Sequence, residues 1–176
     1  YILFKYILTP SYVRRTLMSN FSSKINLKSL GPIQIANAHC DIPCGIYDPR
    51  DAIQAAQTVI RMTELIEEID FSGGPSHNLA NSMARYVHVK EEHAKKAKDD
   101  ILIIWTDYFK PEHLADYPNL HELFWNANKL AGANKQGVSS ASAKELVDAV
   151  DEIAKIFWAT KGVDYSDPNA DVRYGS

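Results

Sequence analysis

The sequence predicts an all-α protein that folds as an antiparallel four-helix bundle. After residue 48, apolar residues recur at helical spacing in four segments, Gly, Pro and Ser clusters separate them, and β-strand patterns are few. With 176 residues, 45% of them hydrophobic, the chain is long enough for one compact domain and too short for two. Four amphipathic segments joined by short loops favour antiparallel neighbours.

The first two helices are indicated by their ends as much as by their periodicity. Asp48, Pro49 and Asp51 supply a capping side chain, a proline at the first helical position and an acid in the first turn. Gly73, Gly74 and a following proline end this helix, and a second, unusually long helix is expected over residues 78–109. Its apolar face is formed by Leu79, Met83, Tyr86, Val87, Ala94, Ala97, Ile101, Ile104, Trp105 and Tyr108.

The third and fourth helices complete the predicted bundle. Residues 111–131 form a helical segment that we expect to break near Tyr117 and Pro118. Ser142 and Glu145 form a capping-box pattern ahead of the fourth apolar face, which continues to Trp158. Residues 162–176 are expected to form a polar, poorly ordered tail, so the bundle itself spans residues 48–161.

The first 38 residues have the composition of a leader that is removed. They carry five Lys or Arg and no acid, they are rich in Ser, and they end in Ala36-Asn37-Ala38, which resembles a small-residue cleavage site. A leader of this kind requires a processing protease as a partner. The basic, acid-free composition is typical of an organellar transit peptide, whereas the end of the segment is typical of export. We expect a cytoplasmic protein, with an organelle or the periplasm as the alternatives.

The charge pattern excludes some classes of partner. Residues 39–176 carry the other 14 basic and all 22 acidic residues, a formal charge of −8. A nucleic-acid-binding surface needs a basic stripe, so no nucleic-acid partner is expected. No segment approaches about 18 uninterrupted apolar residues, and we therefore expect no membrane partner.

The two cysteines, Cys40 and Cys44, are four residues apart and directly follow His39. Such a pair can close a strained disulfide, act as a redox couple or bind a soft metal. If the chain is cut before His39, its new amine, the Cys40 amide nitrogen and both thiolates can lie in one plane. This square N₂S₂ set suits Ni(II) or Cu(II), whereas Zn(II) prefers a tetrahedron. The His39 imidazole stays available as an axial ligand.

Three sequence blocks resemble the nickel superoxide dismutases. The first is the run HCDIPCGIYDP at residues 39–49, which is similar to the family's nickel hook and defines residues 39–47 as that segment here. The second is WTDYFKP at residues 105–111, and the third is KIFW at 155–158 with Thr160 and Lys161. The resemblance implies superoxide as the substrate, a nickel ion in each subunit that cycles between Ni(II) and Ni(III), and a homohexamer.

The resemblance also assigns roles to particular residues. His39 would supply its amine and imidazole, Cys40 its amide and thiolate, and Cys44 the second thiolate. Pro43 matches a proline preceded by a cis peptide bond. The remaining matches are Tyr47 and Tyr108, which would border the substrate cavity, and Asp41 and Asp107, which would join its hydrogen-bond network. Lys110 is expected either to add positive potential that attracts superoxide or to be a solvated lysine.

This chain departs from the family pattern at two positions. A glutamate and an arginine that orient the axial imidazole fall, by register, on Ala55 and His93. We therefore expect a different orienting network, built from Gln54, Gln57 or His93. The other histidines have no metal-like spacing and are expected in surface or core roles; they are His77, His88, His113 and His121.

Two alternatives make different use of the same cysteines. A non-catalytic nickel- or copper-binding helical protein would need the hook but neither Tyr47 nor the DYFKP block. A bundle with a Cys40–Cys44 disulfide would need no metal and would have no free thiols.

Overall fold

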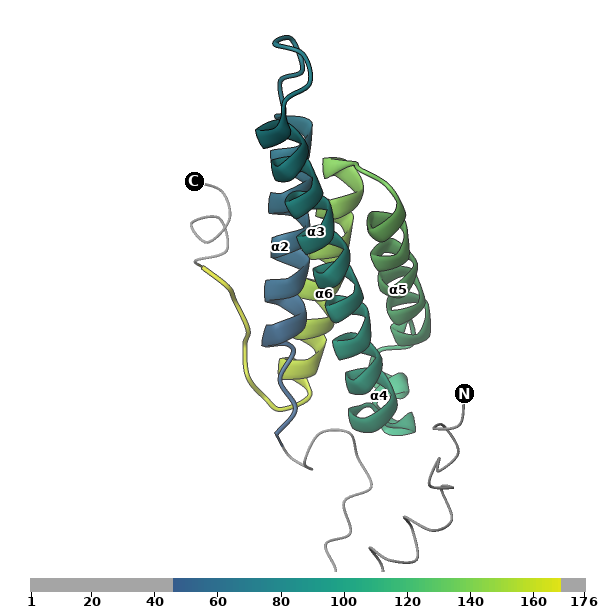
Figure 1. The fold of residues 1–176 in the computed structure, drawn as a ribbon. Coiled ribbons are helices and arrows are strands. Elements are labelled where there is room, and N and C mark those ends of the chain that lie inside the picture. The colour runs from purple at the N-terminus through teal and green to yellow at the C-terminus, as the bar shows by residue number, and fades with distance from the viewer. Residues whose placement is uncertain (1–45, 169–176) are drawn as a thin grey trace, which may run out of the picture. The chain divides into compact units, whose positions relative to one another are not determined.

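The computed structural model describes residues 46–168, and all the regular elements of that range are helical. Four long helices lie side by side, and the short helix α4 lies at one end of them (Figure 1). The elements are α2 (Arg50–Glu67), α3 (His77–Ile103), the π-helical turn η2 (Ile104–Tyr108), α4 (Pro111–Asp116), α5 (Leu120–Gln136) and α6 (Ser140–Ala159). Within the described residues, no helix is long and apolar enough to cross a membrane.

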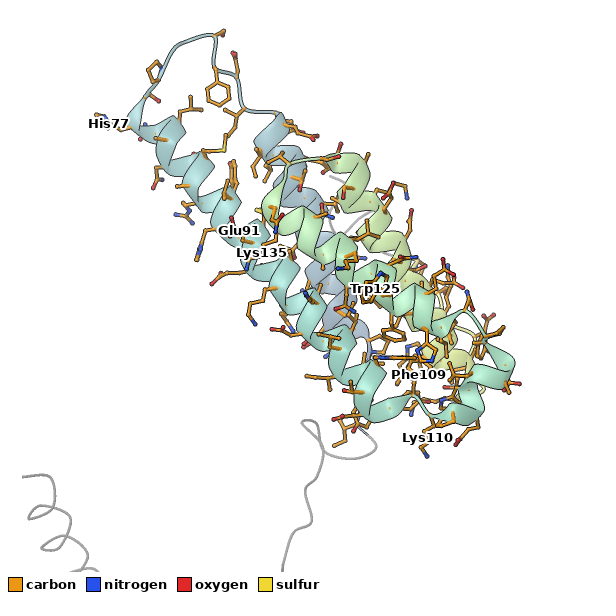
Figure 2. All side chains as sticks on the ribbon, turned by 90° about the vertical axis from the view of Figure 1, so that its right-hand side faces the viewer. His77, Glu91, Phe109, Lys110, Trp125 and Lys135 are labelled. Carbon is orange, nitrogen blue, oxygen red and sulfur yellow. The ribbon has the colours of Figure 1, made fainter. Side chains whose placement is uncertain are left out.

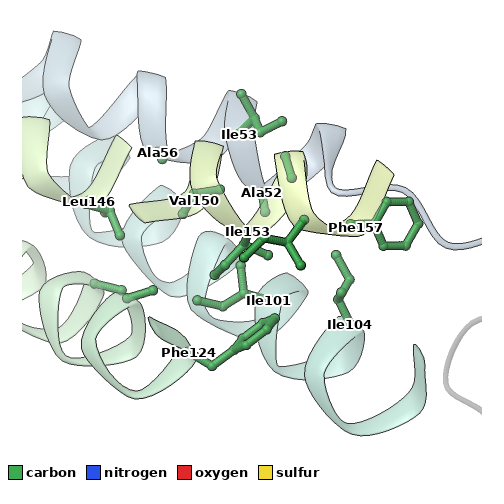
Figure 3. Close-up of a cluster of buried hydrophobic side chains, with 14 of the residues drawn as sticks. Ala52, Ile53, Ala56, Ile101, Ile104, Phe124, Leu146, Val150, Ile153 and Phe157 are labelled. Atoms are coloured by element: carbon green, nitrogen blue, oxygen red, sulfur yellow. The ribbon is translucent and has the colours of Figure 1, made fainter. Parts of the chain in front are cut away.

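The helices pack as a four-helix bundle in which each contacts two neighbours. Helix α2 packs against α3 and α6, and α5 packs against the same two helices from the other side. The apolar faces meet in one core, shown in Figure 3. Its fully buried members come from all four helices and include Ala52, Val59, Ile101, Phe124, Leu146, Val150, Ile153 and Phe157. The predicted four-helix architecture is confirmed.

The helix ends show which of the predicted caps operate. The Asp48 carboxylate accepts a hydrogen bond from the Arg50 amide at 2.8 Å, but the N-cap position of α2 is Pro49, which makes no side-chain capping hydrogen bond. The expectation that Ser142 caps the fourth helix is wrong. Ser139 caps it by accepting from the Ser142 amide at 3.3 Å, and Glu67 at the end of α2 accepts from the Ser140 amide at 3.0 Å. With these two acceptors in place, α6 begins at Ser140, about one turn before the start that a Ser142 cap would give.

Two further boundaries differ from a regular helix pattern. The helix expected over residues 78–109 is α-helical only to Ile103, after which η2 forms a wider turn. The expected break near Tyr117 and Pro118 is present, since α4 ends at Asp116 and α5 begins at Leu120. Proline has no amide hydrogen and cannot continue the preceding helix.

A buried lysine joins α3 to the end of α5. Lys90 is only 2% exposed, and its ammonium donates to the Asn134 carbonyl, to that of Gly137 at 2.7 Å and to that of Lys135 at 3.4 Å. These carbonyls lie at the C-terminal end of α5, where the helix dipole favours a cation. Burial lowers the pKa of Lys90, and the nearby Glu91 carboxylate opposes this shift.

Replacing Lys90 by methionine is expected to lower the free energy of unfolding by about 2–4 kcal/mol, because the carbonyls at the end of α5, including that of the buried Asn134, lose a charged donor. Urea denaturation of this variant and the parent protein measures the difference. Lys98→Met is the matched control on the exposed side of α3 and should change the free energy by less than about 0.5 kcal/mol. Equal effects in the two variants would contradict a capping role for Lys90.

Candidate functional site

The predicted metal ligands lie outside the described residues. His39, Cys40 and Cys44 fall before residue 46, and so do Asp41 and the peptide bond that precedes Pro43. The described chain begins with Ile46, which is 71% exposed, and continues into the buried Tyr47. The structure therefore describes the candidate site from Ile46 and Tyr47 onward, where the 39–47 segment joins the bundle.

Tyr47 packs against Tyr108, and this contact is the centre of the candidate site. Tyr47 precedes α2 and is 8% exposed, whereas Tyr108 ends η2 and is half-buried. Their ring centroids are 5.8 Å apart and the ring planes are tilted by 57°. Two tyrosines that the sequence associates only through the family resemblance are thus neighbours in the fold.

The π-helical turn η2 sets the direction of Tyr108. The Phe109 amide donates to the Ile104 carbonyl at 3.2 Å, which is the five-residue spacing of a π-helix. This wide turn ends α3, and the backbone becomes extended at Phe109. Phe109 is buried in the core, while Tyr108 stays at the edge of the bundle beside Tyr47.

Other aromatic rings hold Tyr108 in place. Its centroid lies 4.4 Å from that of Phe157 on α6 and 5.2 Å from that of Phe109, which meets it edge-on. His113 stacks on Tyr108 at 5.7 Å with a 16° angle, and its Nδ1 accepts from the Lys110 amide at 3.1 Å. His113 therefore has a packing role beside the site. We call Tyr47, Tyr108, Phe109, His113 and Phe157 the aromatic cluster.

The structure adds two polar residues that the sequence did not single out as site residues. The Tyr108 hydroxyl lies 2.6 Å from the Thr160 hydroxyl, just after α6. The Lys161 ammonium lies 5.0 Å from the centroid of the Tyr108 ring and 5.1 Å from that of Phe157. Their only sequence signal was their position after the KIFW block. Their contact with Tyr108 depends on how α6 returns beside η2, which spacing does not show.

Asp107 and Lys110 flank Tyr108 along the chain. The half-buried Asp107 accepts from the Thr106 hydroxyl at 3.2 Å. Lys110 precedes α4 and is exposed, and Figure 2 shows it at the same end of the bundle as Phe109 with its side chain directed outward. Lys161 contacts the aromatic cluster through its ammonium, and Lys110 contacts it through its backbone amide.

The positions that depart from the family pattern lie on facing helices. Ala55 on α2 is buried, and His93 on α3 is half-buried with its Nδ1 2.9 Å from the Val89 carbonyl of its own helix. Gln54 is exposed. Gln57 is 3% exposed, and its amide donates to the Asp167 carboxylate at 3.1 Å.

The residues after α6 form a strap, which we define as residues 163–167. Gly162, with φ of +71°, turns the chain back, and Tyr165 packs on the core. The hydrogen bond from Gln57 to Asp167 ties this strap to α2. It borders a groove beside the start of α2 whose walls include Asp48, Gln54, Trp158 and Tyr165.

The described part of the site supplies phenols, a hydroxyl and a cation beside apolar rings. Among residues 46–168, no group of three or more His, Cys, Asp or Glu side chains is placed to hold a metal ion. What this end of the bundle offers is a rigid aromatic wall with hydrogen-bonding groups and positive charge. Such a wall suits a small anion or the water around it.

Comparison with known proteins gives consistent matches. A model of the nickel-containing superoxide dismutase family matches residues 34–161. The nickel superoxide dismutase of Streptomyces seoulensis is 37% identical over 125 residues, which cover 71% of this chain and 89% of that protein. The nickel superoxide dismutase of Streptomyces coelicolor is 35% identical over 130 residues, which cover 74% of this chain and 93% of that protein.

A solved structure shares the fold. It is a Ni-containing superoxide dismutase whose nickel ligation corresponds to the oxidized state, and it is similar to this chain with a TM-score of 0.60 and 35% identity. The similarity covers 71% of this chain and 100% of the other. The family-model match includes residues 39–47 and ends before the strap.

Proposed function

Because this chain belongs to the nickel-containing superoxide dismutase family, it is a superoxide dismutase with a nickel cofactor, and we propose that residues 39–47 hold the nickel beside Tyr47 and Tyr108. The observation that carries this proposal is the burial of Tyr47 against Tyr108 at 5.8 Å. Cys44 precedes Tyr47 by three residues, so chain geometry keeps their Cα atoms within about 11 Å. The cysteine pair is therefore tethered to the aromatic cluster.

The donor set fits nickel. His39, placed at a free N-terminus, would supply an amine and an imidazole, Cys40 an amide nitrogen and a thiolate, and Cys44 a second thiolate. A planar set of two nitrogens and two sulfurs favours a square-planar ion. When bound, nickel in this anionic set supplies a one-electron couple between its +2 and +3 states, which suits alternate oxidation and reduction of superoxide.

The residues of the bundle would then control access and charge. Tyr47 and Tyr108 border the approach to the hook, and the buried rings behind them limit the access of bulk water and peroxide. This matters because thiolates are oxidised by peroxide. Lys161 places positive charge near Tyr108, and the exposed Lys110 adds a second cation two residues after Tyr108 in the chain; this charge would draw superoxide toward an otherwise acidic chain.

The protein cut before His39 is expected to contain close to one nickel per chain. Elemental analysis of that protein, grown with nickel and zinc both present, measures the metal content alongside dismutase activity. The planar donor set should select nickel because zinc prefers a tetrahedron and avoids an amide ligand. Full zinc occupancy with activity retained would contradict the proposed ligands.

We also propose three properties that the leader and the family resemblance support. A protease removes residues 1–38, the mature chains assemble as a homohexamer, and the enzyme acts in the cytoplasm, with an organelle or the periplasm as the alternatives. N-terminal sequencing of protein from its native source would reveal His39 as the first residue if processing occurs. Light scattering of that protein gives the assembly mass, and a mass other than six chains would contradict the hexamer.

A further inference from the structure

The Tyr108 hydroxyl has a hydrogen-bond partner whose own bonding fixes the direction of the bond. Tyr108 Oη and Thr160 Oγ1 are 2.6 Å apart, so either oxygen could be the donor on distance alone. Thr160 Oγ1 is also 2.6 Å from the carbonyl oxygen of Phe157. A threonine hydroxyl has one proton to donate, so only one of these two oxygens can receive it.

The backbone hydrogen bonds at the end of α6 show which of these two oxygens receives the Thr160 proton. The Lys161 amide, which would ordinarily bind the Phe157 carbonyl, donates to Trp158 at 3.0 Å. The Gly162 amide donates to Ala159 at 2.9 Å and the Val163 amide to Trp158 at 3.0 Å, which is the pattern of a Schellman motif. The Phe157 carbonyl, which can only accept, receives its hydrogen bond from Thr160.

We propose that Thr160 is a positioning residue of the dismutase site, which accepts the phenolic proton of Tyr108 and leaves the Tyr108 oxygen as an acceptor toward the substrate approach. The proposal rests on the proposed function, in which Tyr47 and Tyr108 border that approach. With its proton directed to Thr160, Tyr108 cannot donate to superoxide. Its free lone pair can instead order a molecule that carries a proton, such as water or the hydrogen peroxide product.

The surroundings of Tyr108 keep this arrangement in place. Phe157 at 4.4 Å and the stacked His113 at 5.7 Å restrict the ring. The Lys161 ammonium, 5.0 Å from the ring centroid, adds a cation for the anionic substrate. Lys161 would therefore attract the anionic substrate, whereas Tyr108 would orient a molecule that carries a proton.

The test uses the nickel-loaded enzyme and three variants. Thr160→Val keeps the side-chain shape and removes the hydroxyl, whereas Thr160→Ser keeps the hydroxyl. Thr58→Val is the matched control, since Thr58 on α2 also bonds a carbonyl of its own helix, that of Gln54 at 2.8 Å, away from Tyr108. Each protein is also made with Tyr108→Phe, so that a difference spectrum isolates this tyrosine.

The spectroscopic measurement is the tyrosine Fermi doublet in ultraviolet resonance Raman spectra, whose intensity ratio separates phenols that donate from phenols that accept. Tyr108 should have the donor ratio in the parent, Thr160→Ser and Thr58→Val enzymes, and lose it in Thr160→Val. An acceptor ratio in the parent enzyme, or no change in Thr160→Val, would overturn the proposal. So would loss of the donor ratio in Thr160→Ser, because the hydroxyl would then not be its cause.

Pulse radiolysis gives the functional consequence. At unchanged nickel content, Thr160→Val should lower kcat/KM by roughly 3- to 10-fold, as expected for one lost hydrogen bond, and Thr160→Ser should restore it. An unchanged kcat/KM in Thr160→Val would overturn the positioning role. Full activity in Tyr108→Phe with the expected Raman ratios would instead contradict the proposed function of Tyr108 at the substrate approach and leave the bond direction intact.

Discussion

A chain that keeps its leader is expected to show almost no dismutase activity, although its helices should fold. While Ala38 is attached, the His39 nitrogen is an amide without a basic lone pair, and it could bind metal only after a costly deprotonation. The chain ahead of it would also crowd the space that superoxide needs beside the residues that would hold the nickel. Removal of residues 1–38 would therefore complete the metal site.

Three proteins test this expectation: the full 1–176 chain, a chain with one alanine before His39 and a chain that starts at His39. Nickel content and dismutase rate are measured for each after nickel is supplied. The single alanine should be nearly as harmful as the whole leader, since both acylate the amine. Full activity of the uncut chain would show that the free amine is not a ligand.

Serine in place of either cysteine is expected to have the second largest effect. Altering groups that only support a metal ligand typically costs 10–100-fold, so losing a thiolate ligand should lower activity by more than about 100-fold. The bundle should still form, because the buried core that the structure describes within residues 46–168 is built without either cysteine. Circular dichroism should show unchanged helix content while activity disappears.

Ile46→Ser is the control for the cysteine variants, since Ile46 belongs to the same 39–47 segment but has no metal-binding side-chain atom and is 71% exposed. It should retain nickel and activity. Near-normal dismutation in Cys40→Ser or Cys44→Ser would require the two-thiolate mechanism to be abandoned.

Much of the fold could be predicted because helix periodicity and helix breakers are local. The four helices and the break near Pro118 follow from them. The cap of α6 was misplaced because Ser139 and Ser142 are both good capping residues. The choice depends on Glu67, which α2 brings to the Ser140 amide. Periodicity also could not reveal η2, because one wide turn changes the pattern little.

The candidate site was predictable only in part. The sequence and its resemblance indicated Tyr47 and Tyr108, and the structure brings them into contact. Thr160 and Lys161 were missed as contacts because they reach Tyr108 only after α6 has packed beside η2. The orienting roles suggested for Gln57 and His93 stay predictions, and both side chains already have partners, Asp167 and Val89.

The geometry of the site depends on the number of residues in the wide turn η2 as well as on their identity. In an α-helix each residue advances the chain by about 100° around the axis. Removing one residue between Ile104 and Tyr108 would favour a regular helix and rotate the next residues by about that angle, away from Tyr47 and Thr160. A substitution on this turn keeps the number of residues and so does not impose this rotation. A deletion among these five positions would therefore displace the site as a whole, whereas a substitution would change only the side chain at its own position.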